Sequence, residues 1–263
     1  MPRFAANLTF LFQDLAFMDR FAAAAEQGFT AVEFMSAYEH APSAVAAALR
    51  DSGLRMALMN SPAGDLAGGE RGLAALPERR RDFRTSIGRA LEYCAATACP
   101  LLHVMAGIVP EKADRRLLQA CYMDNLAWAA EQAASAGVAL TIEPINGRDM
   151  PGYFLRDYDY AETVLKDVKA PNLHLQFDMY HVQILHGDVS HRLDRQYPLI
   201  AHVQVANPPD RREPGKGELQ YDYLFRRLDA LGYAGWVGAE YKPEHGTEAS
   251  LGWFKPYRGK SSV

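Results

Sequence analysis

Four polar residues, each at the end of a short apolar run, are the candidate chemical centre of this chain. They are Glu143, Asp178, Gln204 and Glu240. Successive members lie 35, 26 and 36 residues apart, which is about one strand–helix unit in each case. A buried carboxylate is costly unless it is paired or binds a metal ion. The spacing therefore predicts four strand ends that converge on one site.

The side chains of these four residues offer carboxylate and amide oxygens, which hard divalent cations such as Mg²⁺ and Mn²⁺ prefer. Zinc more often recruits Cys or His ligands. A structural ion pair with Arg or Lys is the alternative for any single acid, but four polar strand ends at regular intervals favour a metal site. We therefore expect all four residues to bind a divalent metal ion, Mg²⁺ or Mn²⁺.

Two glutamates in such a site indicate proton transfer next to a carbonyl group. A metal ion polarises a carbonyl and the adjacent hydroxyl of a substrate, and it stabilises the enolate that develops. Glu143 and Glu240 would face that substrate from opposite sides, so that one removes a proton from carbon and the other returns it at the neighbouring carbon. This chemistry needs no organic cofactor.

Further residues are candidates for contact with the substrate. His181 lies just past the sixth predicted strand, where it can bond a substrate oxygen. Arg211 and Glu213 lie in the loop after the seventh predicted strand, and Arg matches the two oxygens of a carboxylate. His103, in the fourth predicted strand, is expected either to line the pocket or to pack in the core.

Short apolar runs alternate with amphipathic or Ala-rich stretches eight times along the chain. The strand candidates are 4–10, 31–35, 55–60, 101–106, 139–145, 173–179, 200–206 and 236–241. Helices are expected over 14–27, 42–51, 113–136 and 222–231, each followed within two residues by a glycine, a common helix cap.

Alternating strands and helices imply a parallel sheet. Eight units without a Gly-x-Gly-x-x-Gly dinucleotide pattern after the first strand favour a closed (β/α)₈ TIM barrel, which keeps its chemistry at the carboxyl ends of the strands. At 263 residues, the chain suits one α/β domain over 1–263, with 258–263 as a frayed tail.

Long loops follow the predicted strands on the carboxyl side, where loops build the sites of barrel enzymes. Ser61–Leu76 follows the third strand and Asn207–Gln220 follows the seventh, and both are charged and rich in Gly and Pro. Asn146–Tyr158 follows the fifth strand and is a candidate apolar lid. For each loop, the alternative is an ordinary long connection.

Composition argues against several classes of protein. The net charge is −4 and no basic stripe is interleaved with aromatic residues, which disfavours nucleic acid as a partner. Three cysteines form neither a zinc pattern nor an even disulfide framework, which fits a reducing compartment. No apolar span is long enough for a membrane helix or a signal peptide. We therefore expect a cytoplasmic protein without a membrane partner.

Motifs along nearly the whole chain carry a family resemblance. They are Phe4–Leu8, Pro62–Asp65, Gly69–Gly72, Leu102–Gly107, Ile142–Asn146, Gln176–His181, His202–Gln204, Arg211–Glu218 and Gly238–Tyr241. With these segments the chain resembles the hydroxypyruvate isomerase family, among the xylose-isomerase-like barrels that include ketose 3-epimerases. Gln204 is typical of this branch, because the epimerases usually have His there. The turn Asn207–Asp210 and the residue Leu66 depart from the family pattern, in loops that bear on substrate fit.

The resemblance implies a (β/α)₈ barrel that interconverts hydroxypyruvate and 2-hydroxy-3-oxopropanoate through an enediolate. By position, it implies that Glu143 and Glu240 are the proton donor and acceptor pair. It implies that the ligands of Mg²⁺ or a similar ion are Glu143, Asp178, Gln204 and Glu240. It also implies that His181 and Arg211 contact the substrate. Arg212 is the alternative to Arg211 if the loop is aligned one residue along.

Other functions stay open on the sequence. A 2-oxo-tetronate isomerase would use the same metal ion and glutamate pair on a four-carbon acid. A ketose 3-epimerase is disfavoured by Gln204 and by Arg211, a candidate partner for a substrate carboxylate that a ketose lacks. A nuclease of the endonuclease IV kind would need many His and Asp ligands and a basic face. A barrel that only binds a metabolite would not need both glutamates.

The aromatic segment Trp253–Tyr257 leaves the oligomeric state open. It is expected to pack either against a second copy, in a homo-oligomer, or against its own barrel. The substrate itself is expected to be a small hydroxy-oxo acid.

Overall fold

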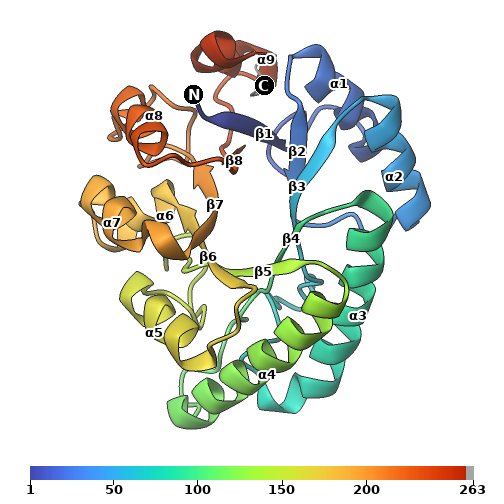
Figure 1. The fold of residues 1–263 in the computed structure, drawn as a ribbon, viewed down its shortest axis with the longest axis vertical. Coiled ribbons are helices and arrows are strands. Elements are labelled where there is room, and N and C mark those ends of the chain that lie inside the picture. Colours follow the sequence, from blue (N-terminus) through green and yellow to red (C-terminus); the bar gives the residue numbers. More distant parts are fainter. Residues whose placement is uncertain (259–263) are drawn as a thin grey trace. The chain divides into compact units, whose positions relative to one another are not determined.

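The computed structural model describes residues 1–258, so the expected frayed tail lies outside the described residues except for Arg258. Eight strands form a closed parallel barrel in chain order, with β1 beside β8 (Figure 1), which confirms the predicted fold class. The strands are β1 Arg3–Asn7, β2 Ala31–Phe34, β3 Arg55–Asn60, β4 Leu101–His103, β5 Ala139–Ile142, β6 Leu173–Asp178, β7 Ile200–Val205 and β8 Trp236–Ala239.

Helices follow the strands, as the alternating pattern predicts. The α-helices are α1 Arg20–Glu26, α2 Pro42–Asp51, α3 Arg80–Thr97, α4 Arg115–Ser135, α5 Tyr158–Val168, α6 Met179–Leu185, α7 Val189–Gln196, α8 Tyr221–Ala230 and α9 Thr247–Ser250. Short 3₁₀ helices are η1 Phe17–Asp19, η2 Pro77–Arg79, η3 Tyr197–Leu199 and η4 Leu251–Tyr257. Gly137, which follows α4, has a φ of 69°, the left-handed conformation of a glycine helix cap.

Several elements are shorter than predicted, for local reasons. β1 ends at Asn7 because the chain turns there, and the Phe10 amide donates back to the Asn7 carbonyl at 3.1 Å. β5 ends at Ile142, and Pro144 just beyond it has no amide hydrogen with which to continue a ladder. The predicted helix over 14–27 begins only at η1, after a residue in extended conformation.

The chain divides into two compact units, Leu58–Gln176 and the remainder, Met1–Ala57 with the chain from Phe177 on. In the second of these, three interior alanines form a small apolar cluster against which Trp236 packs: Ala5, Ala31 and Ala57. Their small side chains leave room for the indole ring. In Leu58–Gln176, β4 and β5 pair in the register His103 with Thr141, and the ladder continues into β6.

The aromatic segment Trp253–Tyr257 packs on its own chain. The Phe4 ring of β1 meets the rings of Trp253, Phe254 and Tyr257 edge to face, with centroids 5.0, 6.0 and 4.9 Å away. Edge-to-face pairs at such distances are favourable. The segment thus covers the outside of β1, so it packs against its own barrel.

Among residues 1–258, no helix combines the length and the apolar character needed to cross a membrane. Cys94, Cys99 and Cys121 all lie in the described range and are buried and free. Burial raises the pKa of the Cys99 thiol, so it stays protonated and unreactive.

Candidate functional site

All four polar residues lie at the carboxyl ends of strands. Asp178 is the last residue of β6, Gln204 is the last but one of β7, and Glu143 and Glu240 directly follow β5 and β8. Each is at most 5% exposed. Parallel barrels present this end of the strands to their substrates. The chain therefore places buried ligand-type side chains where the spacing predicted them.

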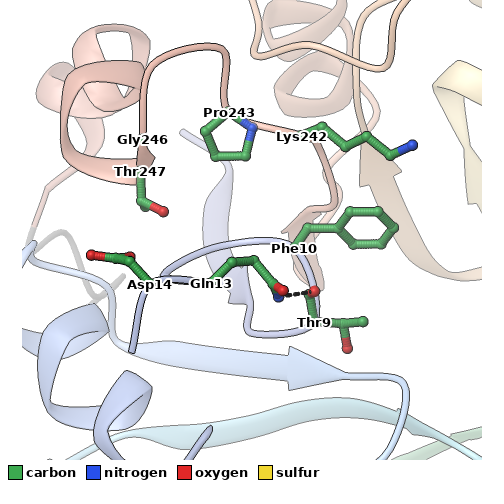
Figure 2. A pocket seen from close by; sticks show the side chains of 8 residues that line it. All are labelled: Thr9, Phe10, Gln13, Asp14, Lys242, Pro243, Gly246 and Thr247. Carbon is green, nitrogen blue, oxygen red and sulfur yellow. Dashed lines mark hydrogen bonds between the residues drawn. The ribbon is translucent and has the colours of Figure 1, made fainter. Parts of the chain in front are cut away.

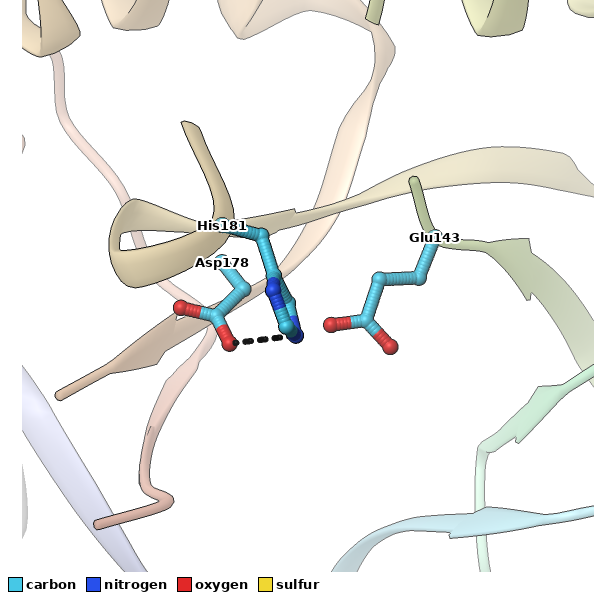
Figure 3. A group of neighbouring side chains, drawn as sticks. All are labelled: Glu143, Asp178 and His181. Atoms are coloured by element: carbon cyan, nitrogen blue, oxygen red, sulfur yellow. Dashed lines mark ion pairs between the residues drawn. The ribbon is translucent and has the colours of Figure 1, made fainter. Parts of the chain in front are cut away.

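Asp178 and His181 are linked through the start of α6. The Asp178 Oδ1 atom caps this helix by accepting the Tyr180 amide hydrogen at 2.8 Å. Its Oδ2 atom lies 3.5 Å from Nε2 of His181, the pair joined by the dashed line in Figure 3. Both side chains are buried. The cap explains why the helix begins directly after the strand, and it holds the carboxylate in one orientation.

Arg211 lies against two of the buried acids. Its Nη2 atom is 3.0 Å from Oε1 of Glu240 and 3.9 Å from Oδ2 of Asp178. The guanidinium group also lies over the rings of Phe10 and Tyr180, 4.7 and 5.0 Å from their centroids. Arg211 has a φ of 59°, a left-handed conformation that is costly for a residue other than glycine. These contacts hold the strained residue in place beside the acids.

Arg212 points elsewhere. Its Nη1 atom donates to the backbone carbonyls of Lys242 and Pro243 at 3.4 and 3.5 Å. Of the two arginines that the sequence could not separate, Arg211 is the one that faces Asp178 and Glu240. Arg211 is 7% exposed, which suits a cation that meets a ligand in a closed site.

Glu33 was not a candidate on the sequence, yet it is the hub of a buried hydrogen-bond cluster. Its carboxylate accepts from Asn7 Nδ2 at 2.9 Å, Gln204 Nε2 at 2.8 Å and His202 Nε2 at 2.6 Å. Glu33 and His202 are both 0% exposed. His202 and Gln204, two residues apart on β7, therefore share a face of the strand, because both side chains reach the same carboxylate. A Glu inside the apolar run 31–35 was the signal that could have identified it.

Glu143 is oriented by a relay of two side chains that the sequence did not single out. The Thr141 hydroxyl donates to Oε1 of Gln176 at 2.9 Å, and Gln176 Nε2 donates to Oε2 of Glu143 at 3.1 Å. An ionised carboxylate only accepts hydrogen bonds, so the NH₂ end of the Gln176 amide faces Glu143, and the Thr141 hydroxyl holds the carbonyl end. His103 Nδ1 lies 3.7 Å from the same Glu143 oxygen, so His103 joins this group and is not merely packed in the core.

Glu213 lies beside Tyr241, in the loop after β7. It is 7% exposed, and its Oε2 atom has no hydrogen-bond partner among residues 1–258. Burial, with a contribution from the charge of Glu213, raises the pKa of Tyr241 to about 12. Tyr241 therefore stays protonated, and its hydroxyl shares a hydrogen bond of 2.8 Å with Ser250. Glu213 thus carries a buried acceptor oxygen near Tyr241, the residue that follows Glu240.

A pocket of about 650 Å³ opens between the loop after β1 and the loop after β8 (Figure 2). One side is lined by Thr9, Phe10, Gln13 and Asp14, and the other by Lys242, Pro243, Gly246 and Thr247. Phe10 belongs to the lining and also stacks on Arg211. Lys242 adds a cation to the rim, and its amide donates to the Arg211 carbonyl at 2.7 Å. The pocket therefore borders the arginine that faces the acids.

The donor atoms suit a metal ion. Glu143, Asp178 and His181 each offer a ligand atom, and all three are buried. Gln204 adds an amide group at the end of β7, with its nitrogen held by Glu33. Buried carboxylates and amide oxygens are the donors that Mg²⁺ and Mn²⁺ prefer. The residues present therefore fit the expected divalent ion.

The chain is similar to known barrel proteins over its whole length. The family model described as xylose isomerase-like TIM barrel matches residues 21–257. A 2-oxo-tetronate isomerase of Cupriavidus necator is 55% identical, over 99% of this chain and 100% of that protein. A hydroxypyruvate isomerase of Escherichia coli is 40% identical, over 98% and 100%. A crystal structure described as AP endonuclease, family 2, from Brucella melitensis is 44% identical, with a TM-score of 0.96 over 98% and 100%.

Proposed function

Because the chain belongs to the xylose isomerase-like TIM barrel family, we propose that it is a metal-assisted aldose–ketose isomerase of short hydroxy-oxo acids. The leading reaction interconverts hydroxypyruvate and 2-hydroxy-3-oxopropanoate. The observation that carries the proposal is a pair of buried glutamates, Glu143 and Glu240, at strand ends that also bear oxygen ligands for a metal ion. The similar proteins with isomerase names support the same reaction class.

The proposal treats 1–263 as one barrel domain whose strand ends face a single site. The closed strand order supports it, because parallel strands in a barrel end on one face. β5 and β6, which lead to Glu143 and Asp178, are neighbours in that order. Glu240 follows β8, which is three strands after β5 and two after β6 in that order, and this supports a role on another side of the substrate.

The proposed cofactor is Mg²⁺ or Mn²⁺, with four ligands: Glu143, Asp178, Gln204 and Glu240. When bound, the ion supplies Lewis-acid polarisation of the substrate carbonyl and hydroxyl. His181, whose Nε2 lies 3.5 Å from Asp178, is assigned to a substrate oxygen.

The proton transfers follow from the positions of the two glutamates. In hydroxypyruvate, one glutamate takes the proton from C3 and leaves an enediolate, and the other delivers a proton to C2. A proton also moves from O3 to O2, so that the atoms balance. In the reverse direction, the glutamates exchange roles. Gln176 holds Oε2 of Glu143, which assigns the transfer to Oε1.

Arg211 is assigned to the substrate carboxylate, because a guanidinium group matches its two oxygens. The rings of Phe10 and Tyr180 orient the guanidinium plane. Glu213 and His103 are assigned to the substrate-facing wall, Glu213 as an acceptor for a hydroxyl and His103 as a neighbour of Glu143.

A four-carbon 2-oxo-tetronate is the second candidate substrate. The observation that favours it is the name of the relative from Cupriavidus necator, at 55% identity. Such an acid keeps the carboxylate, carbonyl and hydroxyl of hydroxypyruvate and adds one carbon. The pocket bordered by Phe10 and Lys242 supports room for that carbon beside Arg211.

A small molecule, and not nucleic acid, is the proposed partner, although the similar Brucella melitensis protein is described as an AP endonuclease. In the basic cluster of Arg79, Arg80, Arg81 and Arg84, two arginines have acidic partners. Arg79 pairs with Glu70 and Asp82, and Arg80 Nη2 lies 3.3 Å from Asp124. The free buried cysteines support a reducing, cytoplasmic location.

The test is metal-dependent turnover. Protein stripped by a chelator is resupplied with Mg²⁺ or Mn²⁺ and offered hydroxypyruvate, a 2-oxo-tetronate and a ketose, with product aldehyde or epimer detected separately. Metal-restored turnover of either acid supports the reaction class, and the ratio of the two kcat/KM values decides the substrate. Turnover of the ketose alone, or of none of the three by folded and metal-loaded protein, refutes the proposal.

A further inference from the structure

We propose that Glu33 is a positioning residue that fixes the orientation of the Gln204 amide, so that the amide oxygen is presented to the metal ion. The inference rests on the proposed function, which assigns Gln204 as a ligand. Glu33 lies on β2 and is not itself a proposed ligand. Its effect on the ion is therefore exerted through Gln204.

The orientation follows from donor and acceptor chemistry. An ionised carboxylate only accepts hydrogen bonds, whereas one end of a Gln amide donates and the other accepts. Glu33 Oε1 lies 2.8 Å from the Gln204 side chain, so the end that faces it must be the NH₂ group. The carbonyl oxygen of Gln204 then points away from Glu33. A metal ion needs that oxygen, because an NH₂ group turned toward the ion has no lone pair for it.

Neighbouring side chains hold the Glu33 carboxylate in place. The Asn7 side chain donates to Oε1 at 2.9 Å, and Asn7 lies opposite Glu33 in the pairing of β1 with β2. His202 Nε2 lies 2.6 Å from Oε2. Each oxygen therefore has at least one hydrogen-bond partner, and neither is left to the solvent, since Glu33 is 0% exposed. Such partners behind a metal ligand commonly tune its affinity.

A glycine on β8 makes room for this arrangement. A Cβ atom at Gly238 would lie 2.3 Å from each carboxylate oxygen of Glu33. Gly238 is also the register partner of Gln204 between β7 and β8. The carboxylate thus lies in the space that a side chain at position 238 would fill, directly beside the residue it orients.

The test exchanges the carboxylate and the amide between positions 33 and 204, first at position 33 alone and then at both positions. In Glu33→Gln, the new amide can donate to the Gln204 oxygen, which turns the Gln204 NH₂ group toward the ion. We expect the Mn²⁺ dissociation constant to rise about 10- to 100-fold. The double variant Glu33→Gln with Gln204→Glu restores the hydrogen bond with the donor and acceptor reversed. A carboxylate at 204 presents an oxygen in either orientation, so the double variant is expected to regain wild-type Mn²⁺ affinity or better.

Mn²⁺ binding is measured by electron paramagnetic resonance of the free ion, in a titration of metal-free protein. Thermal unfolding of the same metal-free samples reports any purely structural effect of Glu33. If Glu33→Gln does not fold, Gly238→Ala places a methyl group against the same carboxylate and is expected to weaken Mn²⁺ binding in the same way. Unchanged Mn²⁺ affinity in the single variant, or no recovery in the double variant, overturns the inference.

Turnover of the two acids, measured beside the Mn²⁺ titration, separates this inference from the proposed function. Wild-type protein that binds Mn²⁺ with the expected dependence on Glu33, but turns over neither acid, refutes the isomerase and supports the role of Glu33. Wild-type protein that turns over an acid, with Mn²⁺ affinity indifferent to Glu33, refutes only the inference. Wild-type protein that binds no Mn²⁺ overturns both.

Discussion

The Glu33 carboxylate occupies the space beside Gly238, where an added Cβ atom would lie 2.3 Å from both of its oxygens. A methyl group at this position must displace either the carboxylate or the β8 backbone. Glu33 lies on β2 and Gly238 on β8, and each of these strands pairs with β1. The requirement for glycine here is thus imposed by a side chain from a strand that is not adjacent.

Gly238→Ala should lower the free energy of unfolding by about 1–3 kcal/mol, the usual cost of overpacking. Denaturant unfolding of the metal-free protein measures this loss. Gly88→Ala is the matched control, because nothing lies within 4 Å of a Cβ at this position of α3. The control should gain about 0.5–1 kcal/mol, the helical preference of Ala over Gly. Equal effects of the two substitutions would contradict the packing argument.

Arg211→Lys should weaken recognition of the substrate carboxylate. An ammonium group cannot present two parallel donors, and hydrogen bonds to charged groups contribute about 1.5–3 kcal/mol. At about 1.4 kcal/mol per tenfold, kcat/KM should fall about 10- to 100-fold. Steady-state kinetics with hydroxypyruvate and a 2-oxo-tetronate provide the measurement.

Arg212→Lys is the matched control for this substitution, because the Arg212 guanidinium group donates to the backbone carbonyls of Lys242 and Pro243, at 3.4 and 3.5 Å. Its kcat/KM should stay within a factor of about two of wild type, as for most surface changes. If both arginine variants lose activity alike, Arg211 has no special role toward the carboxylate.

Thr141→Val should reduce catalysis without a change in shape at the site. The substitution removes the hydroxyl that donates to Gln176 at 2.9 Å, so the Gln176 carbonyl loses the partner that holds the amide against Glu143. We expect kcat to fall about tenfold, the lower end for lost support behind a ligand. Thr97→Val is the control, because its buried hydroxyl donates only within α3, to the Tyr93 carbonyl at 2.7 Å. A kcat equal to wild type in Thr141→Val would show that the relay does not orient Glu143.

His174→Gln should flatten the dependence of stability on pH. Burial lowers the pKa of His174 in β6 below its ordinary value of 6.5. As the pH falls below 6.5, the unfolded chain takes up a proton that the folded chain resists, so the stability is lost progressively down to the folded-state pKa. Above 6.5 both states are neutral at this residue and the contribution is fully present.

Melting temperatures of wild type and His174→Gln between pH 8 and pH 5 measure this contribution. Wild type should lose more stability on acidification than the variant does. His191→Gln, at an exposed position of α7, serves as the control and should follow wild type. Parallel pH profiles for wild type and His174→Gln would contradict the effect of burial.

The barrel could be predicted from the sequence because its signals are local. Each strand is a short apolar run, and a glycine follows each of the four predicted helices, as Gly137 follows α4. The ends of the strands were less predictable. An apolar run such as 139–145 continues past the point where Pro144 interrupts the ladder.

The candidate ligands were also predictable, since a carboxylate that closes an apolar run is unusual in the sequence itself. The side chains that orient them were not. Glu33 contacts Gln204, 171 residues away, and Gln176 of β6 contacts Glu143 at the end of the neighbouring strand β5, 33 residues away. Such contacts depend on strand register and on side-chain reach across the barrel, neither of which is encoded in a local pattern. The choice of Arg211 over Arg212 likewise needed the loop conformation.

The most direct test of the central claim is deuterium uptake during turnover in D₂O. Hydroxypyruvate is converted by metal-loaded protein, the aldehyde is trapped by reduction, and the isotope at C2 is read by mass spectrometry and NMR against an enzyme-free control. Proton transfer by two glutamates predicts deuterium at C2, because the glutamate that delivers the proton exchanges with solvent. Glu143→Gln and Glu240→Gln should each lower the rate about 10²- to 10⁴-fold. A product with hydrogen at C2 derived from C3, formed at an undiminished rate in both variants, would contradict the account.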